Sequence, residues 1–445
     1  MAADCTTDGS YDEVIYCDVC NEQLSSEHKT VEALGHTPKD AVHENEVAAS
    51  CTTDGSYDEV IYCDVCNEQL SSEHKTVEAL GHNYEDGVCS VCGDEEEPQT
   101  TDDVQFTPSQ DGNSYIVSGV NGNPTAINIP ATYNGKPVTS IAEKAFNECE
   151  NLESVNIPNS VTSIGNGAFR GCFSLKSVTV PDSVTTIGES AFYWCESLNN
   201  ITIPNSVKSI GLGAFAYCSS LPSINIPDGV TAIYMHTFNG CSSLTSVVIP
   251  NSVTIIADHA FQNCTKLKSV IIPDSVSTIE DSAFIGCSGL KSITIGKGVT
   301  IIGHSAFQKC TSLETVYWNA IECECGWLEG TTLYGLFNEC SNFTTLVIGD
   351  GVEGIPEYAF YKCGSLETVV ISASVEYIDT DAFYNCSGIN AVYYLGTDDD
   401  RYGISITGRN TDLTWAQWYF YSEEEPTDPD YDWWHYDENG KIVVW

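Results

Sequence analysis

The chain has 445 residues, of which 42% are apolar and 10% aromatic, and its formal net charge is −46. So acidic a chain should be repelled by nucleic acid phosphates and by anionic lipid headgroups, which argues against nucleic acid as a partner. Its longest apolar runs are only a few residues, whereas a membrane helix needs roughly 20, so we expect no membrane insertion. The opening Met-Ala-Ala-Asp has no basic start and no apolar stretch after it, so we expect no secretion signal in this chain.

Two and a half copies of a cysteine-rich repeat make up residues 1–93. Residues 5–36 recur unchanged at residues 51–82, and a shorter piece of the same kind follows at residues 83–93. An identical copy at this length marks an internal duplication of one module.

Each full copy predicts a small β hairpin of the zinc-ribbon type. Tyr11–Cys17 and Glu27–Leu34 form the two strands in the first copy, and a Cys-x-x-Cys knuckle lies at the closed end. Two thiolates on one tight turn supply half of a tetrahedral zinc shell. The two ends of such a hairpin lie roughly 20 Å apart. We therefore expect the open end of one hairpin to share a metal ion with the knuckle of the next.

The candidate zinc ligands form two groups under this hypothesis. They are Cys5, His36, Cys63 and Cys66 at one site and Cys51, His82, Cys89 and Cys92 at the other, with Cys17 and Cys20 left over. Zinc held in this way would be structural, because four protein ligands leave no position open for water. Two alternatives stay open, namely one ion per repeat, held by Cys5, Cys17, Cys20 and His36, or a set of disulfides.

An acidic linker, residues 94–113, leads to a longer array with a period of 23 residues. The array occupies residues 145–390 in eleven units, and an insertion near residues 317–335 interrupts it. Residues 114–144 and the aromatic-rich residues 391–445 depart from the repeat. Because the two end units of a repeat array would expose apolar surface, we predict that these segments cap the array.

Each unit predicts one turn of a solenoid. In the unit that starts at Ala168, Leu175, Val178 and Val180 follow the L-x-x-L-x-L spacing of leucine-rich repeats, in which alternate side chains of a short strand point inward. The predicted fold is mainly β: a right-handed leucine-rich repeat solenoid of eleven 23-residue units with end caps, preceded by the small hairpins. A cysteine three residues after each phenylalanine predicts a reduced thiol that packs as a small hydrophobic group.

The consensus A-F-x-x-C-x-x-L-x-S-V-x-I-P-x-S-V-T-x-I-G resembles the BspA-like leucine-rich repeats of bacterial surface proteins. The resemblance covers residues 114–445, and the Cys…Cys-x-x-Cys…Ala-Leu-Gly-His unit is similar to small cysteine-rich repeats found beside such solenoids. It implies a secreted or cell-surface location and a role in adhesion or ligand capture. It assigns no catalytic activity to the repeat.

A candidate ligand surface follows from the outward-facing positions of the repeat. One such row runs through Asn156, Thr179, Thr202, Asn225, Val248, Ile271, Thr294, Tyr317, Val347, Val370 and Tyr393. Its first members are polar and its later members are mostly apolar or aromatic, which is typical of a protein-binding surface. β propensity alone explains such residues equally well. The predicted ligand-binding residues are Val248, Ile271, Tyr317, Val347, Val370 and Tyr393, with Trp318 and Trp327 from the insertion.

The motifs that usually signal catalysis do not occur in the sequence: it contains no G-x-S-x-G elbow, no phosphate-binding loop and no H-E-x-x-H. We therefore expect a binding protein whose partner is a protein or glycan on a host or neighbouring cell. Two other functions stay open: homo-assembly into a surface layer or fibre, and the targeting module of a larger enzyme.

Overall fold

The computed structural model forms two compact units, residues 1–98 and 99–445. Within the second unit it describes residues 103–326, 335–424, 426, 432–437 and 441–445. Within the first unit it describes residues 9–16, 23–31, 42–48, 55–62, 69–77, 84–85 and 88–89. The described part of the chain contains no helix with the length and hydrophobicity that crossing a bilayer requires.

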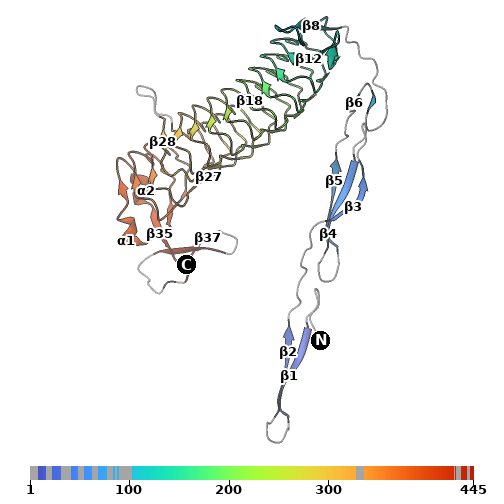
Figure 1. The fold of residues 1–445 in the computed structure, drawn as a ribbon. Helices are drawn as coiled ribbons and strands as arrows, with labels where there is room; N and C mark the ends of the chain where they lie inside the picture. The colour runs from blue at the N-terminus through green and yellow to red at the C-terminus, as the bar shows by residue number, and fades with distance from the viewer. Residues whose placement is uncertain are drawn as a thin grey trace. The chain divides into compact units, whose positions relative to one another are not determined.

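The first unit consists of small antiparallel sheets (Figure 1). Its strands are β1 (Gly9–Tyr16), β2 (Gln23–Val31), β3 (Val42–Val47), β4 (Gly55–Tyr62), β5 (Gln69–Val77), β6 (Tyr84–Glu85) and β7 (Val88–Cys89). β1 pairs with β2, β4 with β5, and β6 with β7, while β3 joins the free side of β4. The hairpin predicted for each full copy is therefore confirmed.

The second unit is a solenoid in which each turn contributes one strand to each of two series (Figure 1). The first series comprises β10 (Ala126–Asn128), β13 (Ser154–Asn156), β15 (Ser177–Thr179), β17 (Asn200–Thr202), β19 (Ser223–Asn225), β21 (Ser246–Val248), β23 (Ser269–Ile271), β25 (Ser292–Ile295), β27 (Thr315–Trp318), β29 (Thr345–Ile348), β31 (Thr368–Ile371), β33 (Ala391–Tyr394) and β35 (Gln417–Tyr421). Neighbouring strands of this series are parallel and in register, so that Val155, Val178 and Ile201 stack on one another.

The second series consists mostly of two-residue strands. It comprises β9 (Tyr115–Val120), β12 (Lys136–Ile141), β14 (Ser163–Ile164), β16 (Thr186–Ile187), β18 (Ser209–Ile210), β20 (Ala232–Ile233), β22 (Ile255–Ile256), β24 (Thr278–Ile279), β26 (Ile301–Ile302), β28 (Glu324–Cys325), β30 (Gly354–Ile355), β32 (Tyr377–Ile378) and β34 (Ser405–Ile406). The predicted solenoid is confirmed, with about 13 turns rather than eleven. The difference arises because both predicted caps add strands to the same ladders.

The core is a column of repeated side chains between the two series. Its phenylalanines stack ring on ring from Phe146 to Phe383, and neighbouring ring centroids are 5.0–5.8 Å apart. The eleven repeat cysteines are free and buried, as predicted. They also do more than fill space, because nine of them donate a hydrogen bond to a phenylalanine carbonyl of the previous turn, as Cys195 Sγ does to Phe169 O at 3.1 Å.

Both ladders are interrupted at one turn, between β17 and β19 and between β18 and β20. The breaks between β21 and β23 and between β28 and β30 each interrupt one ladder only. In the preceding turns, the amide of Asn199 donates to Lys176 O at 2.9 Å. The equivalent residue of the next turn is Pro222, which has no N–H to donate. We call this interruption the seam.

A change of residue also removes a hydrogen bond across the seam on the side of the second series. At Ser183, Ser206 and Ser252 a hydroxyl donates to a carbonyl of the previous turn, but the turn at the seam has Gly229 in that position. The ring spacing between Phe215 and Phe238 is 5.8 Å, the widest in the phenylalanine column. Backbone contacts persist beside these rings, since Phe215 N donates to Thr237 O at 3.0 Å.

The amino-terminal end is closed by β8 (Val104–Pro108), which pairs antiparallel with β9, and by β11 (Thr132–Tyr133), which pairs with β12. Residues 104–108 were predicted to belong to the linker. They form a strand because Val104 is buried against the core and Phe106 stacks on Tyr133 with ring centroids 4.2 Å apart.

The carboxy-terminal end contains α1 (Asp398–Arg401), α2 (Thr411–Trp415) and a hairpin of β36 (Trp433–Tyr436) and β37 (Ile442–Val444). Trp418, Phe420 and Trp434 are buried here. Large aromatic side chains thus cover the apolar end of the core, which is what an end cap requires.

Candidate binding surface

The outward row of the first series starts as a line of exposed polar side chains. Strand residues alternate between the core and solvent, so Val155, Val178 and Ile201 are buried while Asn156, Thr179 and Thr202 are exposed. Asn156 Nδ2 donates to Asn128 Oδ1 of the previous turn at 2.8 Å.

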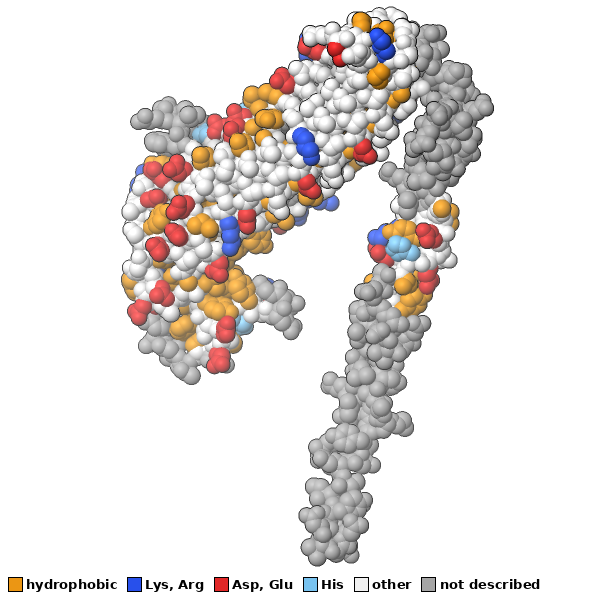
Figure 2. All heavy atoms as spheres, viewed as in Figure 1, with side chains coloured by type: hydrophobic (Ala, Val, Ile, Leu, Met, Phe, Trp, Pro, Cys, Tyr) orange, Lys and Arg blue, Asp and Glu red, His pale blue; other side chains and the backbone are white. Residues whose placement is uncertain are grey.

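The middle of the row is apolar and open to solvent. Val248 is 71% exposed, Ile271 is 70% exposed, and Tyr317 is 43% exposed. Thr294, which lies between Ile271 and Tyr317, is half-buried. We call Val248, Ile271, Thr294 and Tyr317 the free stripe. Figure 2 shows many more acidic than basic side chains on the visible face of the solenoid, so the surface as a whole is anionic.

The far end of the row is covered. Val347 and Tyr393 are half-buried, and Val370 between them is only 1% exposed, so its predicted role as a ligand contact is wrong. The cause is the carboxy-terminal hairpin. The Trp434 ring packs edge-on at 5.4 Å from the Tyr393 ring and at 4.8 Å from the Tyr436 ring.

Tyr436 also lies near Tyr317 at the other side of Val370. Burial is the main cause that raises the pKa of the Tyr436 phenol, and the nearby phenols of Tyr421 and Tyr317 raise it further. The aromatic side chains of β36 therefore extend over the row from Tyr393 towards Tyr317, and they remove Val370 from solvent.

The two tryptophans predicted from the insertion do not add to this surface. Trp318 is fully buried, because it follows Val316 by two residues on the inward face of β27 and lies in register with Ile295 and Ile348. Its ring packs edge-on against Phe360 at 5.4 Å. Trp327 lies outside the described residues.

The predicted zinc ligands cannot be placed in the structure. Cys5, Cys17, Cys20, His36, Cys51, Cys63, Cys66, His82 and Cys92 lie outside the described residues, and of Cys89 only the backbone, at the end of β7, is described. No group of three or more metal-ligating side chains is found in the part of the chain that the structure describes. The zinc array therefore stays a prediction.

Cys325, in the Cys-x-Cys of the insertion, is not an activated thiol. The hydrogen bond with Cys323 raises the pKa of the Cys325 thiol well above its usual value, and burial raises it further. A thiol whose pKa is raised carries little thiolate at neutral pH and is a poor nucleophile.

An exposed aromatic cluster was not predicted from the sequence. Tyr193, Trp194 and Tyr217 lie with ring centroids 5.0–6.0 Å apart. Trp194 and Tyr217 both have φ = 61°, at a repeat position where other turns carry glycines such as Gly171 and Gly240 with φ = 71° and 74°. Bulky residues rarely adopt this left-handed conformation. An alignment of the units would have revealed the cluster as aromatic residues at a position that favours glycine.

Two histidines at equal positions in neighbouring turns form a stacked pair. The imidazole rings of His236 and His259 have centroids 5.0 Å apart and an interplanar angle of 11°. Burial lowers the pKa of His236, the neighbouring His259 lowers it further, and Asp258 opposes both effects. The folded state thus disfavours a positive charge on His236.

We expect this pair to make folding less stable in mild acid. In the unfolded chain His236 titrates near its usual pKa of about 6.5, above its folded value, so its stabilising contribution is complete above that pH and is lost as the pH falls below it. Thermal unfolding followed by circular dichroism between pH 7.5 and 5 should show a smaller fall in Tm for His259→Ser than for the wild type. Serine is matched to the site, because Ser282 occupies this position in the next turn. Parallel Tm curves for the two proteins would contradict the prediction.

Comparison with known proteins identifies the family of the repeats. The family described as BspA type leucine rich repeat region matches residues 123–245, 231–323 and 332–396, in six copies. A search of curated proteins found no match.

Two solved structures illustrate the similarity. A leucine rich cell surface protein from Faecalibacterium prausnitzii is 29% identical, the match covering 69% of this chain and 97% of that chain with a TM-score of 0.38. A leucine-rich repeat protein from Bacteroides ovatus is 25% identical, the match covering 73% of this chain and all of that chain with a TM-score of 0.40. The family matches span more than half of the sequence, and the chain therefore belongs to the BspA type leucine rich repeat family.

Proposed function

We propose that this protein is a non-catalytic binding protein, secreted or displayed on a cell surface, whose first-series sheet contacts a protein ligand through the free stripe. The observation that carries the proposal is the solvent exposure of Val248 and Ile271 on neighbouring turns. Large aliphatic side chains that remain this exposed on neighbouring turns are typical of interaction surfaces. Membership of the family supports the surface location and the lack of catalysis.

A protein is the better ligand for this sheet than a glycan. The free stripe offers two aliphatic side chains and one aromatic ring over four successive turns, which is roughly 15 Å at the spacing of neighbouring strands. An apolar centre bordered by polar residues, here Thr202 and Asn225, matches the anatomy of protein interfaces. A basic patch on the partner would complement the acidic surroundings.

The proposal is tested by placing charge on the stripe. The double variant Val248→Glu/Ile271→Glu should lower binding of the fluorescently labelled protein to cultured epithelial cells by more than about tenfold in flow cytometry, because buried anchors dominate interface energies. The double variant Thr179→Glu/Thr202→Glu adds the same charge to the polar part of the same row and should change binding less than about twofold. Treating the cells with protease should abolish binding. Equal effects of the two double variants, or binding that survives protease, would contradict the proposal.

Self-assembly is the second candidate function, because a second copy would also cover the free stripe. Light scattering coupled to size-exclusion chromatography separates the two functions. A mass that rises with concentration in the wild type, and not in Val248→Glu/Ile271→Glu, supports assembly. A constant monomer mass supports capture of a foreign protein.

A further inference from the structure

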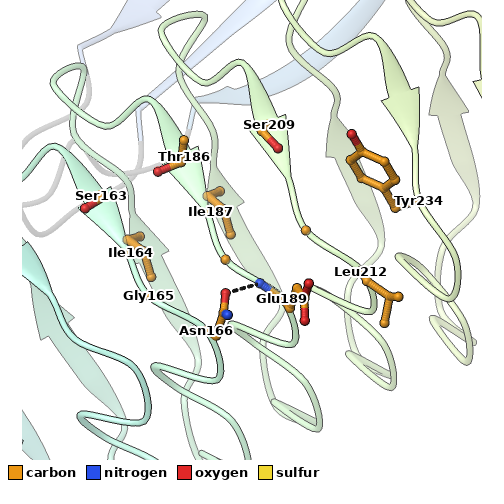
Figure 3. A pocket seen from close by; sticks show the side chains of 12 residues that line it. Ser163, Ile164, Gly165, Asn166, Thr186, Ile187, Glu189, Ser209, Leu212 and Tyr234 are labelled. Carbon is orange, nitrogen blue, oxygen red and sulfur yellow. Dashed lines mark hydrogen bonds between the residues drawn. The ribbon is translucent and has the colours of Figure 1, made fainter.

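A trough of about 560 Å³ lies on the second series, on the sheet formed by β14, β16 and β18 (Figure 3). It belongs to a different sheet from the free stripe, so its role is independent of the function proposed above. Figure 3 shows side chains from three successive turns along the trough, with Tyr234 of the fourth turn at one end.

Glycine backbone forms part of the lining of the trough. Gly165, Gly188 and Gly211 occupy the same position in three successive turns, and a Cβ atom at each would lie 2.5–2.6 Å from backbone atoms of the previous turn. In the fourth turn this position is Tyr234, which is 45% exposed. Glycine therefore lets these turns pack closely on one another, and Tyr234 is the first residue at this position to place a ring in the lining.

Polar groups line one side of the trough. Ser163, Thr186 and Ser209 are in register on neighbouring strands, which places three hydroxyl groups in a line. No hydrogen bond from these hydroxyls to another described residue is found. Asn166 Oδ1 accepts the backbone N–H of Glu189 at 2.9 Å, which holds the Asn166 side chain at the trough. Hydroxyl and amide groups together offer both donors and acceptors.

We propose that the trough binds an uncharged oligosaccharide. A sugar presents hydroxyls along its edge and an apolar face of C–H groups, and these match a line of serine and threonine hydroxyls ending at an aromatic ring. The three glycine turns span roughly 10 Å, about the length of two sugar residues. Tyr234 stacks against the terminal sugar, while Ser163, Thr186 and Ser209 exchange hydrogen bonds with its neighbours.

The other ligand classes fit less well. An anionic ligand meets no lysine or arginine in the lining, which instead contains Glu189, and it meets a chain of net charge −46. An extended peptide binds a sheet through free backbone groups at an edge. Within the trough β14 pairs with β16 and β16 with β18, as when Lys208 N donates to Thr185 O at 2.9 Å, so only the side of β18 that faces the seam offers such groups.

Isothermal titration calorimetry of the full chain tests the proposal. The probes are the neutral trisaccharides maltotriose, cellotriose, mannotriose, xylotriose and chitotriose, with the acidic trisaccharide sialyllactose for comparison. We expect saturable binding of at least one neutral probe at millimolar concentration or below. Tyr234→Gly should weaken it by about tenfold. This variant restores the residue of the three preceding turns and should therefore fold.

A second pair of variants keeps the test informative if Tyr234→Gly fails to fold. Thr186→Ala should weaken binding about fivefold, the effect of one lost hydrogen bond. Thr278→Ala changes the same repeat position in β24, outside the trough, and should leave affinity unchanged. The proposal is overturned if no neutral probe binds, if sialyllactose binds as tightly as the best neutral probe, or if Thr186→Ala and Thr278→Ala have equal effects.

Discussion

Replacing Phe261 by alanine is expected to lower the free energy of unfolding by about 4 kcal/mol. Phe261 is fully buried, and its ring stacks between Phe238 at 5.2 Å and Phe284 at 5.0 Å. The truncation removes the transfer free energy of the ring, leaves a cavity in the column and deprives both neighbours of a stacking partner. Urea unfolding followed by circular dichroism measures the loss.

The end of the phenylalanine column provides the control. Phe146 is just as buried, but in the column it stacks on Phe169 alone. Because each aromatic pair contributes about 1 kcal/mol beyond area burial, Phe146→Ala should cost about 1 kcal/mol less than Phe261→Ala. Equal losses would mean that the rings stabilise the solenoid by burial alone, without a stacking contribution.

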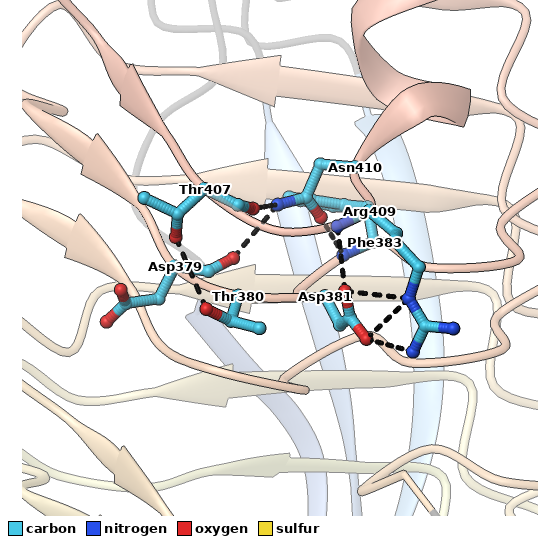
Figure 4. A network of polar contacts seen from close by, with 7 residues as sticks. All are labelled: Asp379, Thr380, Asp381, Phe383, Thr407, Arg409 and Asn410. Carbon is cyan, nitrogen blue, oxygen red and sulfur yellow. Dashed lines mark hydrogen bonds and ion pairs between the residues drawn. The ribbon is translucent and has the colours of Figure 1, made fainter.

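Replacing Arg409 by methionine is expected to cost about 2 kcal/mol, through the ion pair that ties the carboxy-terminal cap to the last repeat (Figure 4). The Asp381 side chain is only 4% exposed, and it accepts the Arg409 backbone N–H at 2.7 Å and its Nε at 3.1 Å. The guanidinium also lies 4.0 Å over the Tyr384 ring. Methionine would leave a buried carboxylate with fewer donors. The cost stays below that of a fully buried pair because Arg409 is 61% exposed and water screens it.

The pH dependence of this loss identifies its cause. The hydrogen bond from Arg409 lowers the pKa of Asp381, against the opposing effect of burial. The pair therefore stabilises the fold fully above the unfolded pKa of about 3.9 and loses this effect as the pH falls through the lower folded value. The stability difference between wild type and Arg409→Met, measured by urea unfolding, should shrink below pH 4.

Lys176→Met is the matched control for Arg409→Met. Lys176 and Glu153 also form an ion pair, 2.7 Å long, but both side chains are more than half exposed. This variant should change stability by less than about 1 kcal/mol. A similar loss for the two methionine variants would show that burial of Asp381 does not matter.

The repeat itself was predictable because strand periodicity and turn spacing determine which side chains can face the core. Leu175, Val178 and Val180 are all buried, as their spacing predicts. The same alternation, carried on to Trp318, would have predicted its burial. The prediction that Trp318 contacts a ligand was wrong because it treated Trp318 as part of the insertion and not as part of the strand.

Contacts made by distant segments were not predictable from the repeat. Nothing in the sequence around Val370 distinguishes it from Val248. Strand β36, which begins 63 residues after Val370, covers Val370 and leaves Val248 exposed. The trough was missed for a different reason. It depends on glycines at one position of three turns and on the tyrosine that replaces them, a pattern that appears only when the units are aligned with one another.

The seam at Pro222 and Gly229 has a mechanical consequence. Repeat arrays behave as chains of nearest-neighbour couplings, so an interface with fewer hydrogen bonds divides the array into two cooperative blocks. The missing bonds lie on the two strand series, whereas the phenylalanine column and its backbone contacts continue across the seam. We therefore expect a pulling force that bends the solenoid to open this turn first, with the phenylalanine column as the pivot.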